Sequence, residues 1–262
     1  MIDLHNHILP GIDDGPSGIA ESIASAETAV ADGVRIVAAT PHLREDYPGV
    51  RPSELSSRCT ELSARLRERG VDVQVVCGGE VDLLWAQEAS TEELKLVSYA
   101  QRGTDLLIET PYGFLPRTFE QLLFRVAVRG YRLILAHPER SPTFQREPQR
   151  LAGLVQQGVL IQLTAGALMT SRRGSSSGGL AKWLVKHQLA HIVASDAHGS
   201  DVLRSPLSHA AAALEPLAGD RAGWMVNEAP AAVLAGEPIP EAPDERPRRD
   251  GSTRRSLWRS RS

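Results

Sequence analysis

The chain alternates short apolar runs with longer segments in which apolar residues recur at every third or fourth position. The short runs are bounded by turn-forming residues, which is typical of buried β-strands. This pattern predicts strands over Ile2–His5, Val34–Ala39, Val71–Val76, Asp105–Glu109, Arg132–Ala136, Val159–Leu163 and His191–Ala194.

The segments between these runs have the spacing of amphipathic helices. The first follows Ser17, the expected N-cap, and ends at Gly33, because glycine readily takes the left-handed conformation that terminates a helix. Later helices are predicted in the same way over Glu54–Arg69, Phe119–Val128, Pro148–Gln157 and Leu180–His187.

Strands that alternate with helices indicate parallel β/α units. The predicted strands are apolar throughout, as strands of a parallel sheet are when helices cover both faces. We therefore expect an α/β fold in which seven β/α units form a closed or nearly closed barrel. An open, doubly wound sheet is the alternative.

Two segments lack this regularity. Ser171–Gly179 is polar and glycine-rich, and we expect a flexible loop there. Residues 237–262 are rich in proline, arginine and serine, so we expect one domain over residues 1–236 and a disordered tail after it. The tail carries seven arginines against five acidic residues, and it is either a solvated extension or a contact for anionic lipid or an acidic partner.

Composition narrows the class of protein. The 262 residues are 42% hydrophobic, and no run approaches the roughly 18 apolar residues that a membrane crossing needs. A net charge of −3 argues against nucleic-acid binding. The first residues lack the pattern of a secretory signal, and the two cysteines, Cys59 and Cys77, suit a reducing compartment. We expect a cytoplasmic protein.

Histidine, aspartate and glutamate residues follow six of the seven predicted strands. Since the carboxyl ends of parallel strands meet at one rim, we expect these side chains to converge. They are His5, His7 and Asp14 after the first strand, His42 after the second, Glu80 after the third, Glu109 at the end of the fourth, His137 after the fifth, and Asp196 and His198 after the seventh. Only the sixth strand lacks a strong ligand. His187, His191 and His209 are given no role.

Burying so many carboxylates together is costly unless cations compensate them. Nine candidates are too many for one ion, so two or three ions are implied, with Glu80 able to bridge. Imidazole and carboxylate ligands without cysteine suit Mn²⁺, Fe or Zn²⁺ better than Ca²⁺. Asp14 is preferred to Asp13 because it immediately precedes Gly15, but the choice between the two stays open.

Two arginines refine the expected chemistry. Arg140 follows His137 by three residues and Arg204 follows His198 by six, so both can reach the rim unless they are ordinary surface residues. A guanidinium matches phosphate oxygens bidentately. Clustered divalent ions activate water and stabilise the oxygens of a phosphoryl group in displacement. The candidate metal ligands and the two arginines together therefore favour a phosphoesterase.

The segments that carry these residues resemble the polymerase-and-histidinol-phosphatase (PHP) superfamily, and its bacterial CpsB/YwqE-type tyrosine-phosphatase branch in particular. The matching stretches are His5–Gly15, Ala39–His42, Gly78–Glu80, Leu106–Glu109, Ala136–Arg140 and Ala194–His198. Departures are the long Ser171–Gly179 link, the arginine-rich tail, and Asn227–Pro230 where a shorter Asn-Pro is common.

The resemblance implies a distorted seven-unit barrel of the PHP type and a trinuclear manganese site. It makes the nine residues above the ligands, and Arg140 and Arg204 the phosphate binders. It also implies hydrolysis of phosphotyrosine on a bacterial tyrosine autokinase that controls capsule or exopolysaccharide synthesis.

Two mechanisms compete at this point. The stretch Cys59–Arg65 has the spacing of cysteine-dependent tyrosine phosphatases, but it has no glycine and lies in a helical pattern, so we reject it. We expect instead that a metal-bound hydroxide attacks phosphorus directly, with no phosphoenzyme.

Three alternative functions remain open. They are a phosphatase for a small molecule such as histidinol phosphate, another phosphoesterase such as a nuclease, and a non-catalytic binding partner with a degenerate rim.

Overall fold

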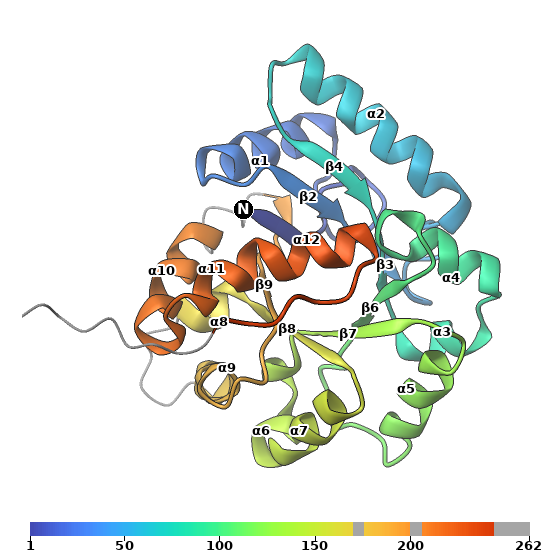
Figure 1. Ribbon diagram of the computed structural model, residues 1–262. Coiled ribbons are helices and arrows are strands. Elements are labelled where there is room, and N and C mark those ends of the chain that lie inside the picture. Colours follow the sequence, from blue (N-terminus) through green and yellow to red (C-terminus); the bar gives the residue numbers. More distant parts are fainter. Residues whose placement is uncertain (170–175, 200–205, 244–262) are drawn as a thin grey trace, which may run out of the picture.

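Parallel strands form the centre of the structure, and helices surround them (Figure 1). The computed structural model describes residues 1–169, 176–199 and 206–243. The strands pair in two sheets, in the orders β1-β2-β4 and β3-β5-β6-β7-β8-β9, and every pairing is parallel. Their bounds are β1 Ile2–Asn6, β2 Ile36–Ala39, β3 His42–Leu43, β4 Gln74–Cys77, β5 Glu80–Val81, β6 Asp105–Glu109, β7 Arg132–Ala136, β8 Leu160–Thr164 and β9 Ile192–Ala194.

The two sheets are continuous with each other. Only Thr40–Pro41 separates β2 from β3, and only Gly78–Gly79 separates β4 from β5. The backbone N–H of Glu80 still donates to the carbonyl of Pro41 across this break, at 3.0 Å. Two strands of the first sheet therefore run on into the first two strands of the second.

The first and last strands also meet. The N–H of Asp196 donates to the carbonyl of His5 at 2.8 Å, and that of His7 donates to the carbonyl of Ala197 at 3.0 Å. The buried carboxylate of Asp3 reinforces this junction, since it accepts from Ser195 N at 2.9 Å. These bonds hold the carboxyl ends of β1 and β9 side by side.

Except at the two short breaks after β2 and β4, helices lie between successive strands along the chain, as the alternating pattern predicts. Their bounds are α1 Ile19–Ala31, α2 Leu55–Glu68, α3 Leu83–Glu88, α4 Thr91–Val97, α5 Phe119–Ala127, α6 Pro142–Arg146, α7 Gln149–Gln156, α8 Ala165–Met169, α9 Ser176–Lys186, α10 Leu207–Ala218, α11 Arg221–Val226 and α12 Glu228–Ala235. The expected α/β class with parallel strands is confirmed.

The predicted C-termini of the helices agree with the structure, whereas the predicted N-cap of the first helix does not. Gly33, Gly70, Gly130 and Gly158 all have positive φ just after a helix, as predicted. Ser17 is not an N-cap: α1 begins after Gly18, and the Ser17 hydroxyl donates instead to Glu21 Oε2 at 3.0 Å.

Three other expectations need correction. The start of the predicted strand Val71–Val76 is not paired in a sheet, and β4 begins at Gln74. Ser176–Gly179 is not loop, because α9 begins at Ser176; the rest of the expected loop lies outside the described residues. The strands β3 and β5, each two residues long, were not predicted, because His42 and Glu80 interrupt the apolar pattern.

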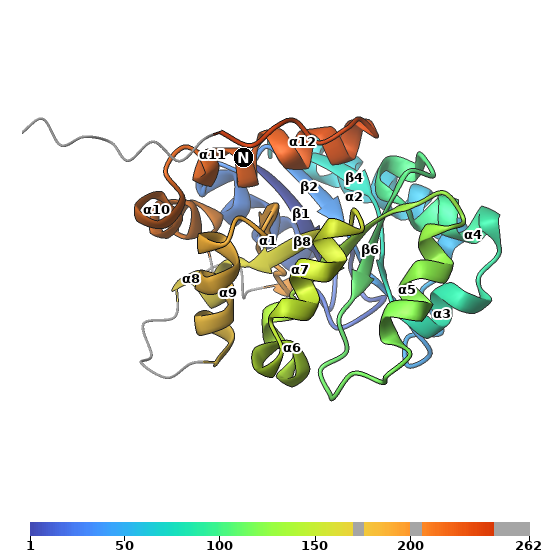
Figure 2. The same ribbon diagram turned by 60° about the horizontal axis from the view of Figure 1, so that its bottom comes forward.

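The amino ends of the strands are covered by the C-terminal helices. Arg132 at the start of β7 donates to the carbonyl of Glu237 at 2.8 Å, and Arg102 before β6 donates to that of Leu234 at 2.7 Å. Trp224 in α11 donates to the carbonyl of Pro240 at 3.3 Å. Figures 1 and 2 show α12 lying across this end of the sheets. The carboxyl ends are left to the connecting loops.

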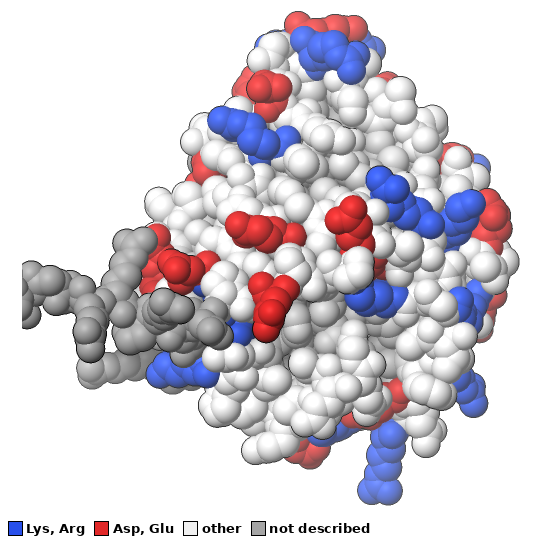
Figure 3. Space-filling view, in the orientation of Figure 1, with Lys and Arg blue, Asp and Glu red and all other residues white. Residues whose placement is uncertain are grey.

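On the side shown in Figure 3, lysine and arginine side chains are scattered among acidic and neutral ones. Within residues 1–169, 176–199 and 206–243, none of the helices combines the length and apolar character that crossing a bilayer requires.

His191, which immediately precedes β9, makes folding stability sensitive to acid. Burial and the nearby Arg221 lower its pKa to about 4, and its Nδ1 accepts from the N–H of Ile161 at 3.2 Å. Between about pH 6.5 and pH 4, the imidazole is therefore protonated in the unfolded chain but mostly neutral in the folded protein. Protonation of His191 in the unfolded chain should therefore lower the free energy of unfolding by about 2 kcal/mol between pH 7 and pH 5.

Urea unfolding at the two pH values tests this expectation in His191→Gln, with His209→Gln on α10 as the exposed control. His191→Gln should lose less stability on acidification than the wild type does. An equal loss in all three proteins would contradict the assignment.

Candidate metal centre

All nine predicted rim residues come together in one cluster. They form four overlapping groups, and within each group one potential ligand atom per residue lies within 4.8 Å of all the others. The groups are His7, Asp14, His42 and His198; His5, His137 and Asp196; His5, His7 and Glu80; and His42, Glu80 and Glu109. Shared members join the groups into a single polar centre at the carboxyl ends of the strands.

The end of β1 supplies two imidazoles that point the same way, as positions i and i+2 of an extended chain do. His5 Nε2 lies 3.3 Å from His7 Nε2, and both rings are fully buried. His5 Nδ1 is held by Gln162 Oε1 at 3.0 Å, and His7 Nδ1 by Asp13 Oδ2 at 2.8 Å. Each ring is thus fixed through one nitrogen and turned toward the cluster with the other, the arrangement typical of metal-binding histidines.

Asp13 and Asp14 have different surroundings. Asp13 accepts three hydrogen bonds, from the His7 ring and from the backbone N–H groups of His42 (3.1 Å) and Gly15 (3.1 Å). Asp14 Oδ1 lies 3.5 Å from His42 Nε2 and 3.4 Å from His198 Nε2. Asp13 therefore orients the site while Asp14 faces the imidazoles. Gly15 is required beside them, since a Cβ there would collide with the His7 carbonyl.

Glu80 lies at the middle of the cluster and is fully buried. Its Oε1 is 2.7 Å from His137 Nε2, and its Oε2 is 3.1 Å from His42 Nδ1 and 3.3 Å from His5 Nε2. Burial acts to raise its pKa, but the rings of His5 and His137 outweigh this effect and hold the pKa well below the usual range. Gly79 sets its position, because a side chain there would collide with Leu43.

The clustered carboxylates make the centre favourable for positive charge. Burial alone would lower the pKa of His5, but the carboxylates of Glu80 and Asp196 raise it to about 9. The pKa of Glu109 is raised by burial and by the neighbouring Glu80. Glu80 Oε2 and His42 Nδ1 are buried and lie 3.1 Å apart, but neither atom makes a hydrogen bond of adequate geometry. Buried nitrogen and oxygen atoms of this kind are suitable ligands for divalent cations, which can bind both at once.

The predicted Arg140 lies beside the cluster. It ends a short 3₁₀ helix, Pro138–Arg140, and its Nη2 is 2.7 Å from Asp196 Oδ2. Its Nη1 donates to Tyr112 Oη at 3.3 Å. Arg204, the other predicted phosphate binder, lies outside the described residues.

Several residues at the site were not predicted. Arg44 donates to Glu109 Oε1 at 3.0 Å, which holds that carboxylate in place. Tyr47 stacks on His42 with 5.3 Å between ring centroids, and Tyr112 stacks on His137 at 5.9 Å. Their only signal in the sequence is that each follows soon after a strand carrying a candidate ligand.

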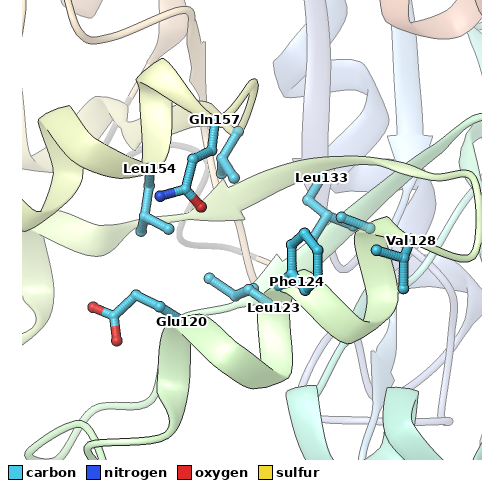
Figure 4. A pocket seen from close by; sticks show the side chains of 9 residues that line it. Glu120, Leu123, Phe124, Val128, Leu133, Leu154 and Gln157 are labelled. Carbon is cyan, nitrogen blue, oxygen red and sulfur yellow. The ribbon is translucent and has the colours of Figure 1, made fainter.

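Two features lie apart from this centre. A groove of 380 Å³ between α5 and α7 is lined mainly by apolar side chains such as Leu123, Phe124 and Leu154 (Figure 4), and none of the nine candidates lines it. Cys59 is buried in α2, as expected of a helical residue, and the neighbouring Cys77 together with burial raises the pKa of its thiol. No phosphate-binding loop surrounds Cys59 in the described part of the chain.

Comparison with known proteins decides the family. The family model for capsular polysaccharide synthesis proteins, CpsB/CapC, matches residues 1–234. The chain belongs to the CpsB/CapC family. It is 32% identical to the tyrosine-protein phosphatase YwqE of Bacillus subtilis over 245 residues, which cover 94% of this chain and 96% of YwqE. It is 30% identical to the putative tyrosine-protein phosphatase CapC of Staphylococcus aureus over 198 residues, which cover 76% of this chain and 77% of CapC.

Structural comparison agrees with this assignment to the CpsB/CapC family. A solved structure matches with a TM-score of 0.79 at 32% identity, covering 94% of this chain and all of that one. It comes from a study of YwqE from Bacillus subtilis and CpsB from Streptococcus pneumoniae, described there as metal-dependent tyrosine phosphatases. The resemblance noted in the sequence is therefore confirmed at the level of the family.

Proposed function

We propose that this CpsB/CapC family member is a metal-dependent protein-tyrosine phosphatase. The observation that carries the proposal is the convergence of five imidazoles and four carboxylates, from the ends and junctions of the strands, on one largely buried centre. Relatives that match over most of their length carry the name tyrosine-protein phosphatase.

The same proposal extends to the fold and the domain. The junctions of β2 with β3, β4 with β5 and β1 with β9 support a distorted (β/α)₇ barrel of the PHP type. We assign residues 1–236 to the phosphatase domain and 237–262 to a C-terminal tail. The tail begins against the body of the protein, since Ile239 and Ala242 pack on the core.

We assign nine residues as ligands for two or three Mn²⁺ ions, with Fe or Zn²⁺ as alternatives. Glu80 is the residue placed to bridge, because its two oxygens face different imidazoles. The full ligand set is His5, His7, Asp14, His42, Glu80, Glu109, His137, Asp196 and His198. Bound cations would lower the pKa of water and offset the charge of the phosphoryl oxygens.

The protein's own groups have three tasks in the reaction. Arg140, held by Asp196, binds and orients the phosphoryl oxygens of the substrate, with Arg204 as its proposed partner. Asp13 and Gln162 keep the His7 and His5 rings in the orientation that ligation needs. The buried strand ends exclude bulk water from all but the open side of the centre, which strengthens each electrostatic contact. We propose direct displacement by water, without a phosphoenzyme.

The substrate is proposed to be a phosphotyrosine protein, and specifically a bacterial tyrosine autokinase in capsule or exopolysaccharide synthesis. The capsular polysaccharide synthesis family and the names of its members support this choice. The two free thiols, Cys59 and Cys77, support a cytoplasmic site of action.

A comparison of substrates tests the function. With Mn²⁺ present, we expect the purified protein to hydrolyse a phosphotyrosine peptide far faster than histidinol phosphate, and to lose this activity when a chelator is added. Preferred hydrolysis of histidinol phosphate would indicate the small-molecule alternative. Full activity in the chelator would contradict metal dependence.

The cysteine-dependent mechanism makes a separate prediction. Since Cys59 is buried in α2 and its thiol pKa is raised, Cys59→Ser should retain at least about half of the wild-type kcat/KM, because no bond to sulfur forms in the reaction. Steady-state kinetics on the phosphotyrosine peptide measures this. Loss of most activity with the fold intact by circular dichroism would restore Cys59 as the nucleophile.

A further inference from the structure

The loop after β6 brings two large aromatic side chains to the surface. Tyr112 is 56% exposed and Phe114 is 66% exposed, although aromatic side chains favour burial. The loop is anchored at both ends: the Thr110 hydroxyl donates to the carbonyl of Ala136, and Thr143 Oγ1 accepts from the N–H of Leu115 at 3.0 Å. The loop that carries the two rings is therefore held at both ends.

Tyr112 borders the metal centre and the phosphate-binding arginine at once. Its ring lies 5.9 Å from that of His137, with 19° between the planes, and its Oη accepts from Arg140 Nη1 at 3.3 Å. Arg140 in turn contacts Asp196. A phosphate bound by Arg140 would therefore lie close to the ring of Tyr112.

Tyr47, the other tyrosine at the centre, is less available. Its ring stacks on His42, with 6° between the planes, and the guanidinium carbon of Arg44 lies 5.8 Å from its centroid. Tyr47 is only partly exposed. Of the two tyrosines at the centre, Tyr112 is the one with more than half of its surface exposed.

We propose that Tyr112 is the surface on which the aromatic ring of the substrate lies, so that it makes the site select aryl over alkyl phosphate monoesters. The inference rests on the proposed phosphatase function. Offset stacking or edge contact between two aromatic rings is favourable beyond the burial of area, and an alkyl ester such as phosphoserine cannot make this contact. Tyr112 is thus a specificity-determining residue, distinct from the groups that hold metal or phosphate.

The test uses the full chain with Mn²⁺ and two peptides of the same sequence, one with phosphotyrosine and one with phosphoserine. Tyr112→Ala should raise KM for the phosphotyrosine peptide by about tenfold. It should leave kcat/KM for the phosphoserine peptide, and the inhibition constant of inorganic phosphate, within about twofold of wild type. Tyr112→Phe should keep the wild-type KM, since the ring and not the hydroxyl makes the contact. Phe124→Ala, at the 61% exposed aromatic of the α5 groove (Figure 4), is the matched control and should change nothing.

Four results would overturn the inference. An equal loss on both peptides would give Tyr112 a merely structural role. A KM raised as much in Tyr112→Phe as in Tyr112→Ala would assign the effect to the bond with Arg140. An unchanged KM in Tyr112→Ala would remove the ring contact altogether while leaving the phosphatase proposal intact. Failure of the wild type itself to hydrolyse the phosphotyrosine peptide would overturn both.

Discussion

Glu80→Gln is expected to lower kcat/KM on a phosphotyrosine peptide by more than about 100-fold and to reduce bound metal. The change keeps the shape of the side chain and removes one negative charge from the middle of the cluster. Glu80 is within 3.5 Å of four of the five imidazoles, so no other residue can replace its role. Kinetics and elemental analysis on the same preparation measure both effects.

Glu88→Gln is the matched control, because Glu88 lies exposed on α3 away from the cluster. It should keep wild-type activity and metal content. If Glu80→Gln were as active as this control, Glu80 would not be a ligand and the cluster would lose its bridging group.

Arg140→Ala is expected to lower kcat by about 100- to 1,000-fold with metal content little changed. The guanidinium is the described cation best placed to neutralise the phosphoryl oxygens as negative charge moves in the transition state. Arg140→Lys should recover only a small part of the loss, because a single ammonium cannot hold Asp196 and a phosphate in the fork geometry. Arg125→Ala, an exposed arginine on α5, controls for the loss of one positive charge.

Single-turnover kinetics separates chemistry from binding for these variants. A large rise in KM with unchanged kcat in Arg140→Ala would mean that the arginine binds substrate without favouring the transition state. Full activity in Arg140→Ala would remove it from the site.

The strands that could be predicted are those marked by an apolar run with turn residues at its ends. The strands Asp105–Glu109 and Arg132–Ala136 have the predicted bounds, because their apolar runs end sharply at turn residues. The strands at His42 and Glu80 escaped prediction, since a two-residue strand leaves no periodicity to detect. The sequence places these two side chains after strands, whereas the structure shows that each begins a strand of its own.

The candidate ligands were predictable and their supports were not. Histidines and carboxylates at successive strand ends are visible in the chain, and the parallel topology alone implies that they meet. The contact of Gln162 with His5 joins two strands that are distant in the sequence, and that of Asp13 with His7 depends on how the loop after β1 turns, so no spacing rule reveals them. The same holds for Tyr112, whose position follows from how its loop is anchored to the segment around Thr143.

The central claim is that the nine clustered side chains hold several divalent cations, and the metal content of the protein tests it most directly. Protein purified without chelator and equilibrated with Mn²⁺ should, after gel filtration, carry two or three metal ions per chain by elemental analysis, and Glu80→Gln should carry fewer. A wild-type protein that is folded yet retains less than one ion per chain, whether isolated or after incubation with Mn²⁺, Fe²⁺ or Zn²⁺, would contradict the account.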